Sequence, residues 1–144
     1  MIYIIFCRIF ELVLSNRNTA KLIKEGAIEC YNFHYNLIVL FHAIFIIFFF
    51  VKSFLNSNLN IEYLFIFMIV QVFRYKVIYD LGTFWTTRII VIEKPLIKTW
   101  IFRNLRHPNY IVVFLEVILV CLFFDDIMSL IFFTLINFIL ITTR

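Results

Sequence analysis

The sequence has 144 residues, of which 64% are hydrophobic and 15% are charged, and its mean hydropathy is +1.00. A soluble domain of this length has about 45–50% apolar and about 25% charged residues, so this composition excludes an ordinary soluble protein. With 2 glycines and 2 prolines the chain has little turn chemistry for an all-β fold. The net charge of +4 lies in predicted loops, a pattern typical of membrane topology rather than of nucleic-acid binding.

The cysteines give no support for a disulfide framework or a zinc site. Cys7, Cys30 and Cys121 are far apart in the sequence, and no two of them have CxxC spacing. We therefore expect no metal in this protein.

Five apolar segments in chain order predict an all-α integral membrane protein with about five transmembrane helices in a single domain, residues 1–144. The first apolar segment is expected to continue as helix into a polar stretch, where Gly26 ends or loosens it. The second half of the third segment carries Gln71, Arg74 and Lys76, so it is expected to face a polar cavity or the lipid headgroups. Asp125 and Asp126 form a tight turn between the last two segments. The predicted spans are residues 1–14, 35–51, 61–81, 109–124 and 127–141.

The charges of the loops predict the orientation of the chain. Basic segments follow the first span, follow the third span and end the chain, while the other two loops hold Lys52 with Glu62 and the acidic pair Asp125-Asp126. By the positive-inside rule the N-terminus is outside and the C-terminus is cytoplasmic. Residues 103–110 then lie at the cytoplasmic face.

The stretch from Arg103 to Glu116 is the best candidate for a site. Pro108 reads as the first residue of a helix and His107 as its N-cap, which places basic residues where free N–H groups can hold an anion. Glu116 lies seven residues after Asn109 and shares its helical face. The alternative is that the positive charge serves membrane topology alone.

Two motifs resemble those of the isoprenylcysteine carboxyl methyltransferase family, especially its small bacterial branch. They are LGTFWTTRIIVI at residues 81–92 and RNLRHPNY at residues 103–110, and further matches run over nearly the whole chain. The resemblance implies an integral membrane enzyme, here of a bacterial inner (plasma) membrane. Such an enzyme uses S-adenosylmethionine to methylate a carboxyl or hydroxyl group on a lipophilic, prenylcysteine-like or polyketide-like acceptor.

The resemblance also implies roles for individual residues. Glu116 and Arg144 are the candidate catalytic residues. The expected partners are the lipophilic acceptor and membrane lipid, with no nucleic acid. The candidate cofactor-binding residues are Lys94, Pro95, Leu96, Ile97, Phe102, Arg106, His107, Pro108, Asn109 and Tyr110.

The chain departs from the family pattern at two places. Trp100, Ile101 and Phe102 stand where the family usually has Gly-Pro-Tyr, and the sequence stops at Arg144, before a pair of glutamates that the family uses to hold the cofactor. The second departure predicts weak or absent activity. The alternative function is therefore a non-enzymatic membrane packing or partner protein, an inactive remnant of the family.

Other polar residues within the spans have structural interpretations beside functional ones. Arg8 and Glu11 are expected to pair on one helix face, and His42 to be a hydrogen-bonded packing residue. Glu116 is either used in catalysis or paired with Arg103 or Arg74. The phenylalanines at residues 48–50 and 123–124 are expected to face lipid.

Overall fold

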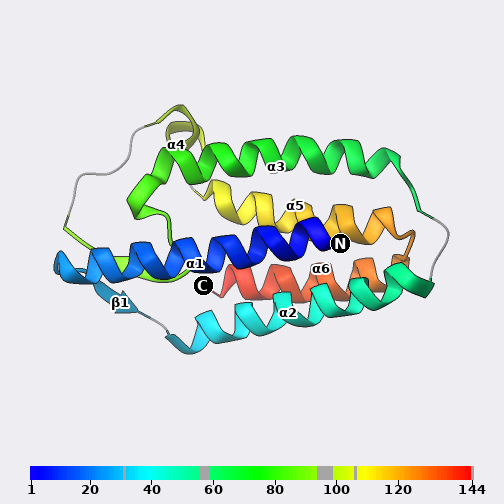
Figure 1. Cartoon of the computed structure of the whole chain (residues 1–144), viewed down its shortest axis with the longest axis horizontal. Helices are drawn as coiled ribbons and strands as arrows, with labels where there is room; N and C mark the ends of the chain where they lie inside the picture. Colours follow the sequence, from blue (N-terminus) through cyan, green and yellow to red (C-terminus); the bar gives the residue numbers. More distant parts are fainter. Residues whose placement is uncertain (31, 56–58, 94–98, 106, 144) are drawn as a thin grey trace. The chain divides into compact units, whose positions relative to one another are not determined.

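The computed structural model describes residues 1–30, 32–55, 59–93, 99–105 and 107–143. The chain divides into two compact units, each described by itself: Met1–Phe50 with Leu81–Ile97, and Val51–Asp80 with Lys98–Arg144. Figure 1 shows the elements along the chain, and their order is α1 (Ile2–Lys24), β1 (Ile28–Cys30), α2 (Asn32–Leu55), α3 (Glu62–Leu81), η1 (Gly82–Phe84), β2 (Ile89–Val91), α4 (Trp100–Asn104), α5 (Pro108–Phe123) and α6 (Ile127–Thr142).

Each predicted apolar segment is a helix, and most ends agree within a few residues. The first segment continues as helix through its polar part, as expected, and ends at Lys24. Gly26 follows with φ +91°, and two backbone bonds close the end: Gly26 N–H donates to Ile23 O and Ala27 N–H to Leu22 O. This pairing is a Schellman motif, which needs a residue in the left-handed region and therefore favours glycine.

The first unit also contains a short ribbon that the sequence analysis did not predict. β1 and β2 pair antiparallel, with Ile28 opposite Val91 and Cys30 opposite Ile89. Arg88, just before β2, donates from Nη1 to both oxygens of Glu29 at 2.8 and 3.1 Å, and this contact raises the pKa of Arg88. Each strand has three residues, which is too short to give a clear alternating pattern in the sequence.

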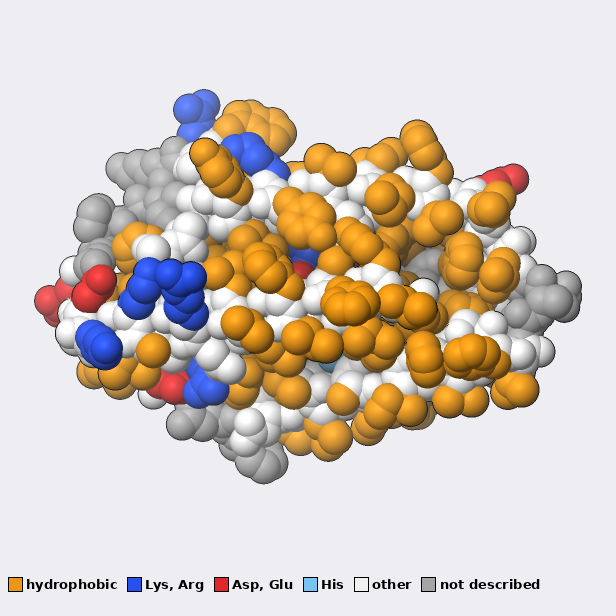
Figure 2. Space-filling view, viewed as in Figure 1, with side chains coloured by type: hydrophobic (Ala, Val, Ile, Leu, Met, Phe, Trp, Pro, Cys, Tyr) orange, Lys and Arg blue, Asp and Glu red, His pale blue; other side chains and the backbone are white. Residues whose placement is uncertain are grey.

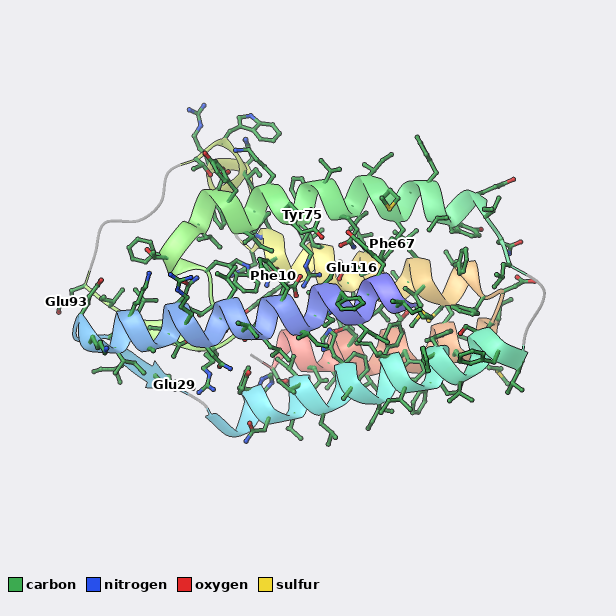
Figure 3. All side chains as sticks on the ribbon, in the orientation of Figure 1. Phe10, Glu29, Phe67, Tyr75, Glu93 and Glu116 are labelled. Atoms are coloured by element: carbon green, nitrogen blue, oxygen red, sulfur yellow. The ribbon has the colours of Figure 1, made fainter. Side chains whose placement is uncertain are left out.

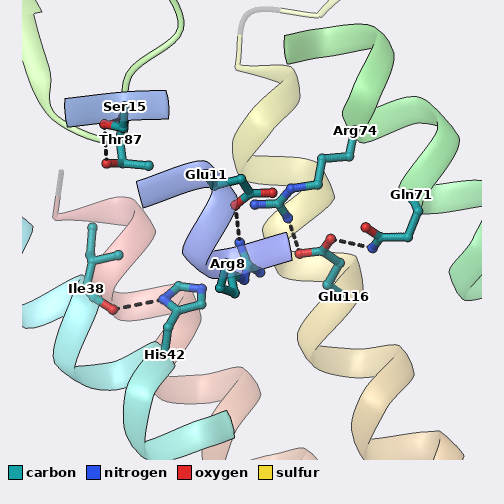
Figure 4. Close-up of polar contacts among 9 residues, drawn as sticks. All are labelled: Arg8, Glu11, Ser15, Ile38, His42, Gln71, Arg74, Thr87 and Glu116. Atoms are coloured by element: carbon teal, nitrogen blue, oxygen red, sulfur yellow. Dashed lines mark hydrogen bonds and ion pairs between the residues drawn. The ribbon is translucent and has the colours of Figure 1, made fainter. Parts of the chain in front are cut away.

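Two side chains of α1 hold the segment around η1. Asn18 Nδ2 donates to the carbonyls of Gly82 and Trp85 at 3.1 and 2.8 Å. Ser15 Oγ lies 2.7 Å from the Thr87 hydroxyl, a contact drawn in Figure 4, and accepts the Thr87 N–H at 2.9 Å. Asn18 and Ser15 thus supply hydrogen-bond partners for backbone groups of this segment, which also contains the fully buried Trp85.

The second unit is built on α3, α5 and α6. α5 and α6 pack against each other as an antiparallel hairpin, yellow to red in Figure 1. The predicted acidic turn joins them: Asp125 has φ +50°, and Asp126 caps α6 by accepting the Ser129 N–H at 3.0 Å. Lys52 pairs with the same carboxylate. Burial by itself raises the pKa of Asp126, but the bonds from Lys52 and Ser129 outweigh burial and lower it to about 2.

The helices differ in how well they fit a membrane. Among the described helices, the stretch His34–Leu55 is the one long and apolar enough to cross a bilayer by length and composition. α5 and α6 are apolar but have 16 residues each, against roughly 20 for a typical span. Figure 2 shows hydrophobic side chains over the N-terminal half of α1 and Lys and Arg over its C-terminal half. The structure confirms that the five predicted segments form helices. That all five cross the membrane, and in which orientation, stays a prediction.

The expectation for the phenylalanine clusters was partly wrong. Phe49 and Phe124 are buried rather than lipid-facing, whereas Phe48 is exposed. Phe49 packs against the ring of Phe45 one turn earlier on α2, with centroids 4.9 Å apart. Consecutive residues of a helix point in directions about 100° apart, so a run of phenylalanines always places some rings on the inner face.

Candidate functional site

The predicted start of α5 is confirmed. His107 is the N-cap and Pro108 occupies the first helical position, where its missing N–H costs no hydrogen bond. The N–H groups of Tyr110 and Ile111 point back to the His107 carbonyl, at 3.1 and 3.5 Å. Pro108 is buried and His107 is exposed, so the helix begins with its proline packed inside and its cap at the surface.

Aromatic faces and one buried acceptor lie at this helix start. The rings of His107 and Tyr110 stack, with centroids 5.1 Å apart and planes 12° from parallel. Asn109, between them in sequence, has a buried Oδ1 that accepts no hydrogen bond from the described residues. A buried acceptor without a donor is costly, so Asn109 Oδ1 is suited to a ligand that brings an N–H or O–H.

Glu116 lies two turns deeper on α5, in contact with α3. Its Oε1 accepts from Gln71 Nε2 at 2.6 Å, and its Oε2 pairs with Arg74 Nη1, as Figure 4 shows. Glu116 is 5% exposed and Arg74 3% exposed. Figure 3 labels Glu116 on α5 together with Phe67 and Tyr75 of α3. Of the two predicted partners for Glu116, Arg74 is the one that pairs with it, and each carboxylate oxygen accepts a hydrogen bond.

Among the described residues, the contact between predicted site residues is the His107–Tyr110 stack. Phe102 is half-buried on α4, and Arg103 on the same helix is exposed and does not pair with Glu116. Seven residues separate Asn109 from Glu116, a rise of roughly 10 Å along the helix, so the carboxylate lies well below the His107–Tyr110 stack. The remaining predicted residues lie outside the described part of the chain: Lys94, Pro95, Leu96, Ile97, Arg106 and Arg144.

Other predicted pairings are confirmed in the first unit. Arg8 Nη1 lies 3.1 Å from Glu11 Oε2 on one face of α1. The His42 ring lies with Nδ1 2.8 Å from the Ile38 carbonyl one turn earlier, as expected of a packing histidine. Neither contact belongs to the second unit, which holds every described candidate for the cofactor site.

The sequence analysis missed two polar residues of α6. Asn137 is 2% exposed, and neither its Nδ2 nor the buried Oγ1 of Thr134 has a hydrogen-bond partner among the described residues. The signal was present in the sequence: two polar side chains three residues apart interrupt a run of Ile, Phe and Leu. Such a pair faces one side of a helix.

Comparison with known proteins gives a family match and two relatives. The model of the isoprenylcysteine carboxyl methyltransferase family matches residues 61–144. The uncharacterized protein YpbQ of Bacillus subtilis is 29% identical over 142 residues, covering 95% of this chain and 84% of that protein. An uncharacterized protein of Haemophilus influenzae is 28% identical over 117 residues, covering 74% and 65%. No solved structure matches the chain.

Proposed function

The chain belongs to the isoprenylcysteine carboxyl methyltransferase family of integral membrane proteins, and from this premise we propose that it methylates a lipophilic acceptor with S-adenosylmethionine. The proposed methyl acceptor is a carboxyl or hydroxyl oxygen on a prenylcysteine-like or polyketide-like molecule. The proposed location is a bacterial inner membrane, in keeping with the bacterial relatives.

One observation carries the proposal for the cofactor. The buried Asn109 Oδ1, which no described residue satisfies, lies beside the His107–Tyr110 stack at the start of α5. S-adenosylmethionine carries an ammonium group and ribose hydroxyls that can donate to such an oxygen, and a planar adenine that can pack on aromatic rings. The positive end of the α5 dipole favours a carboxylate at the same place. The residues present therefore fit the cofactor.

When bound, S-adenosylmethionine would supply the methyl group and become S-adenosylhomocysteine. A carboxylate acceptor would become a methyl ester, and a hydroxyl acceptor would become a methyl ether and release its proton to water. The chain's contribution is to bind and orient: His107, Asn109 and Tyr110 hold one reactant against the helix start. Positioning of this kind lowers the barrier to methyl transfer. The apolar faces of α5 and α6 keep water from the reacting atoms.

Glu116 and Arg144 remain the predicted catalytic residues. The contacts of Glu116 also support a positioning role, because Gln71 and Arg74 engage both of its oxygens and leave no oxygen lacking a donor. A carboxylate held in this way fixes α3 against α5 below the helix start. The two roles predict different activities when Glu116 and Arg74 are replaced together.

Cofactor binding tests the proposal. Isothermal titration of the detergent-purified chain with S-adenosylhomocysteine should show binding that His107→Ala weakens at least tenfold. Asn109→Leu should weaken it about three- to tenfold, the effect of one lost hydrogen bond. Asn104→Leu is the matched control, because that exposed amide bonds the Trp100 carbonyl of its own helix. Absence of binding by the unsubstituted chain would favour the non-enzymatic remnant instead.

A further inference from the structure

The buried amide of Asn137 and the hydroxyl of Thr134 lie three residues apart on one side of α6. Asn137 Nδ2 and Thr134 Oγ1 are both buried, and neither has a partner among the described residues. The rest of this helix from Leu130 to Ile141 is Ile, Phe and Leu. Among the described residues, the Asn137 amide nitrogen and the Thr134 hydroxyl of this apolar helix are thus without a hydrogen-bond partner.

The state of Thr134 differs from that of the other threonines of the helix end. Thr142 Oγ1 donates to the Phe138 carbonyl at 2.9 Å, and Thr143 Oγ1 to the Ile139 carbonyl at 2.8 Å. This bond to the preceding turn is the usual way in which a threonine in an apolar helix satisfies its hydroxyl. No such bond from Thr134 is found within the described residues, so its hydroxyl remains available to another group.

We propose that Asn137 and Thr134 bind the oxygen-bearing head of the lipophilic methyl acceptor. This inference deepens the proposed function and rests on it. The Asn137 amide would donate to a carboxylate, carbonyl or phenolic oxygen, and the Thr134 hydroxyl would bond the same head. The neighbouring apolar side chains of α6 suit a ligand whose remaining body is hydrocarbon.

The position of this pair along the α5–α6 hairpin is compatible with transfer. The rings of Phe114 and Phe138 are in contact, with centroids 6.3 Å apart, so Asn137 lies near the level of Phe114 on α5. Asn109 is five residues nearer the start of α5, a rise of roughly 8 Å. The proposed acceptor head and the proposed cofactor contact therefore lie about one and a half turns apart in the same unit.

Two measurements on the detergent-purified chain test the proposal. The first is titration calorimetry, which measures the binding of two probes, N-acetyl-S-farnesylcysteine and a pentadecylphenol. At least one probe should bind, and Asn137→Leu and Thr134→Val should each weaken its binding about three- to tenfold. Thr142→Val, which removes a hydroxyl already bonded within α6, is the matched control and should leave binding unchanged.

The second measurement is the thermal unfolding of the ligand-free protein. An amide kept for a ligand costs stability when it is unpaired, so Asn137→Leu should raise the unfolding temperature while it weakens probe binding. The proposal would be overturned if Asn137→Leu lowered the unfolding temperature and Thr134→Val left probe binding unchanged, because the amide would then have a structural role.

Binding of S-adenosylhomocysteine separates the two proposals. If it binds while neither probe does, the acceptor site is wrong and the methyltransferase function stands. If a probe binds through Asn137 while S-adenosylhomocysteine does not, the site stands as a lipid site and the proposed function fails.

Discussion

At the scale of single residues, Glu116 of the second unit forms a buried contact with Arg74 and Gln71. Removing one member of a buried ion pair leaves an uncompensated charge and typically costs about 3–5 kcal/mol, whereas replacing both members with apolar residues is often nearly neutral. Glu116→Leu alone and Arg74→Met alone should therefore destabilise the protein strongly, and the double substitution should recover most of that loss.

Thermal or denaturant unfolding in detergent measures this cycle, and methyl transfer by the same variants separates the two roles of Glu116. A positioning role predicts a stable double variant with substantial activity. A stable double variant without activity would assign Glu116 to catalysis.

Residue identity predicted part of this site and missed the rest. Pro108 was predictable as the first residue of a helix, because a proline before an apolar run favours that position. The N-cap at His107 follows from it. The partner of Glu116 required three-dimensional information, because Arg74 and Arg103 are equally plausible by charge. Asn137 was missed because the spacing of Thr134 and Asn137 indicates a shared helix face but does not show that this face is buried or that the amide has no partner.

At the scale of elements, the α5–α6 turn provides a pH-dependent contact. The pKa of Asp126 is lowered to about 2, so its contribution to stability is complete above the ordinary value near 4 and is lost as pH falls towards 2. Asp126→Asn keeps a capping residue and removes the charge that pairs with Lys52. Asp126→Asn should lower the free energy of unfolding at neutral pH by about 0.5–1 kcal/mol. It should also reduce the loss of stability that the protein shows between about pH 4 and pH 2.

The neighbouring Asp125→Asn is the matched control for this experiment. Asparagine tolerates the positive φ of this position, and Asp125 is exposed. If Asp126→Asn lost stability with falling pH in the same way as the unsubstituted protein, the Asp126 carboxylate would not be the source of this pH dependence.

The contact of α1 with η1 gives a second prediction at this scale. Asn18→Leu leaves the Gly82 and Trp85 carbonyls without their donor and should cost about 1–3 kcal/mol. Hydrogen exchange at the Thr87 amide, which bonds Ser15, should accelerate with it. Thr19→Val is the control, since the buried Thr19 hydroxyl has no partner among the described residues. Equal exchange in both variants would contradict the anchoring role of Asn18.

Helices were predictable at this scale because long apolar segments leave few alternatives in a membrane. The β1–β2 ribbon was not, because its three-residue strands are stabilised by a distant pairing and by the Arg88–Glu29 contact. The family model matches residues 61–144, which contain both motifs and the whole α5–α6 hairpin.

At the scale of the whole molecule, the predicted topology can be measured directly. A reporter fused after Phe124 should read as extracytoplasmic, and one fused after Arg144 as cytoplasmic, because the basic segments stay inside. A reporter fused within residues 15–25 should also read as cytoplasmic. A cytoplasmic signal from the fusion after Phe124 would contradict the predicted arrangement of five crossings.

Methyl transfer in membranes tests the central claim most directly. Membranes that contain the chain are incubated with S-adenosylmethionine labelled in its methyl group, and the lipid extract is treated with base. We expect weak lipid labelling that exceeds the level in membranes without the chain and is absent with His107→Ala. Base should release the label as volatile methanol if the acceptor is a carboxyl group and should leave it in the lipid if the acceptor is a hydroxyl group. Lipid labelling no greater than in membranes without the chain would contradict the account.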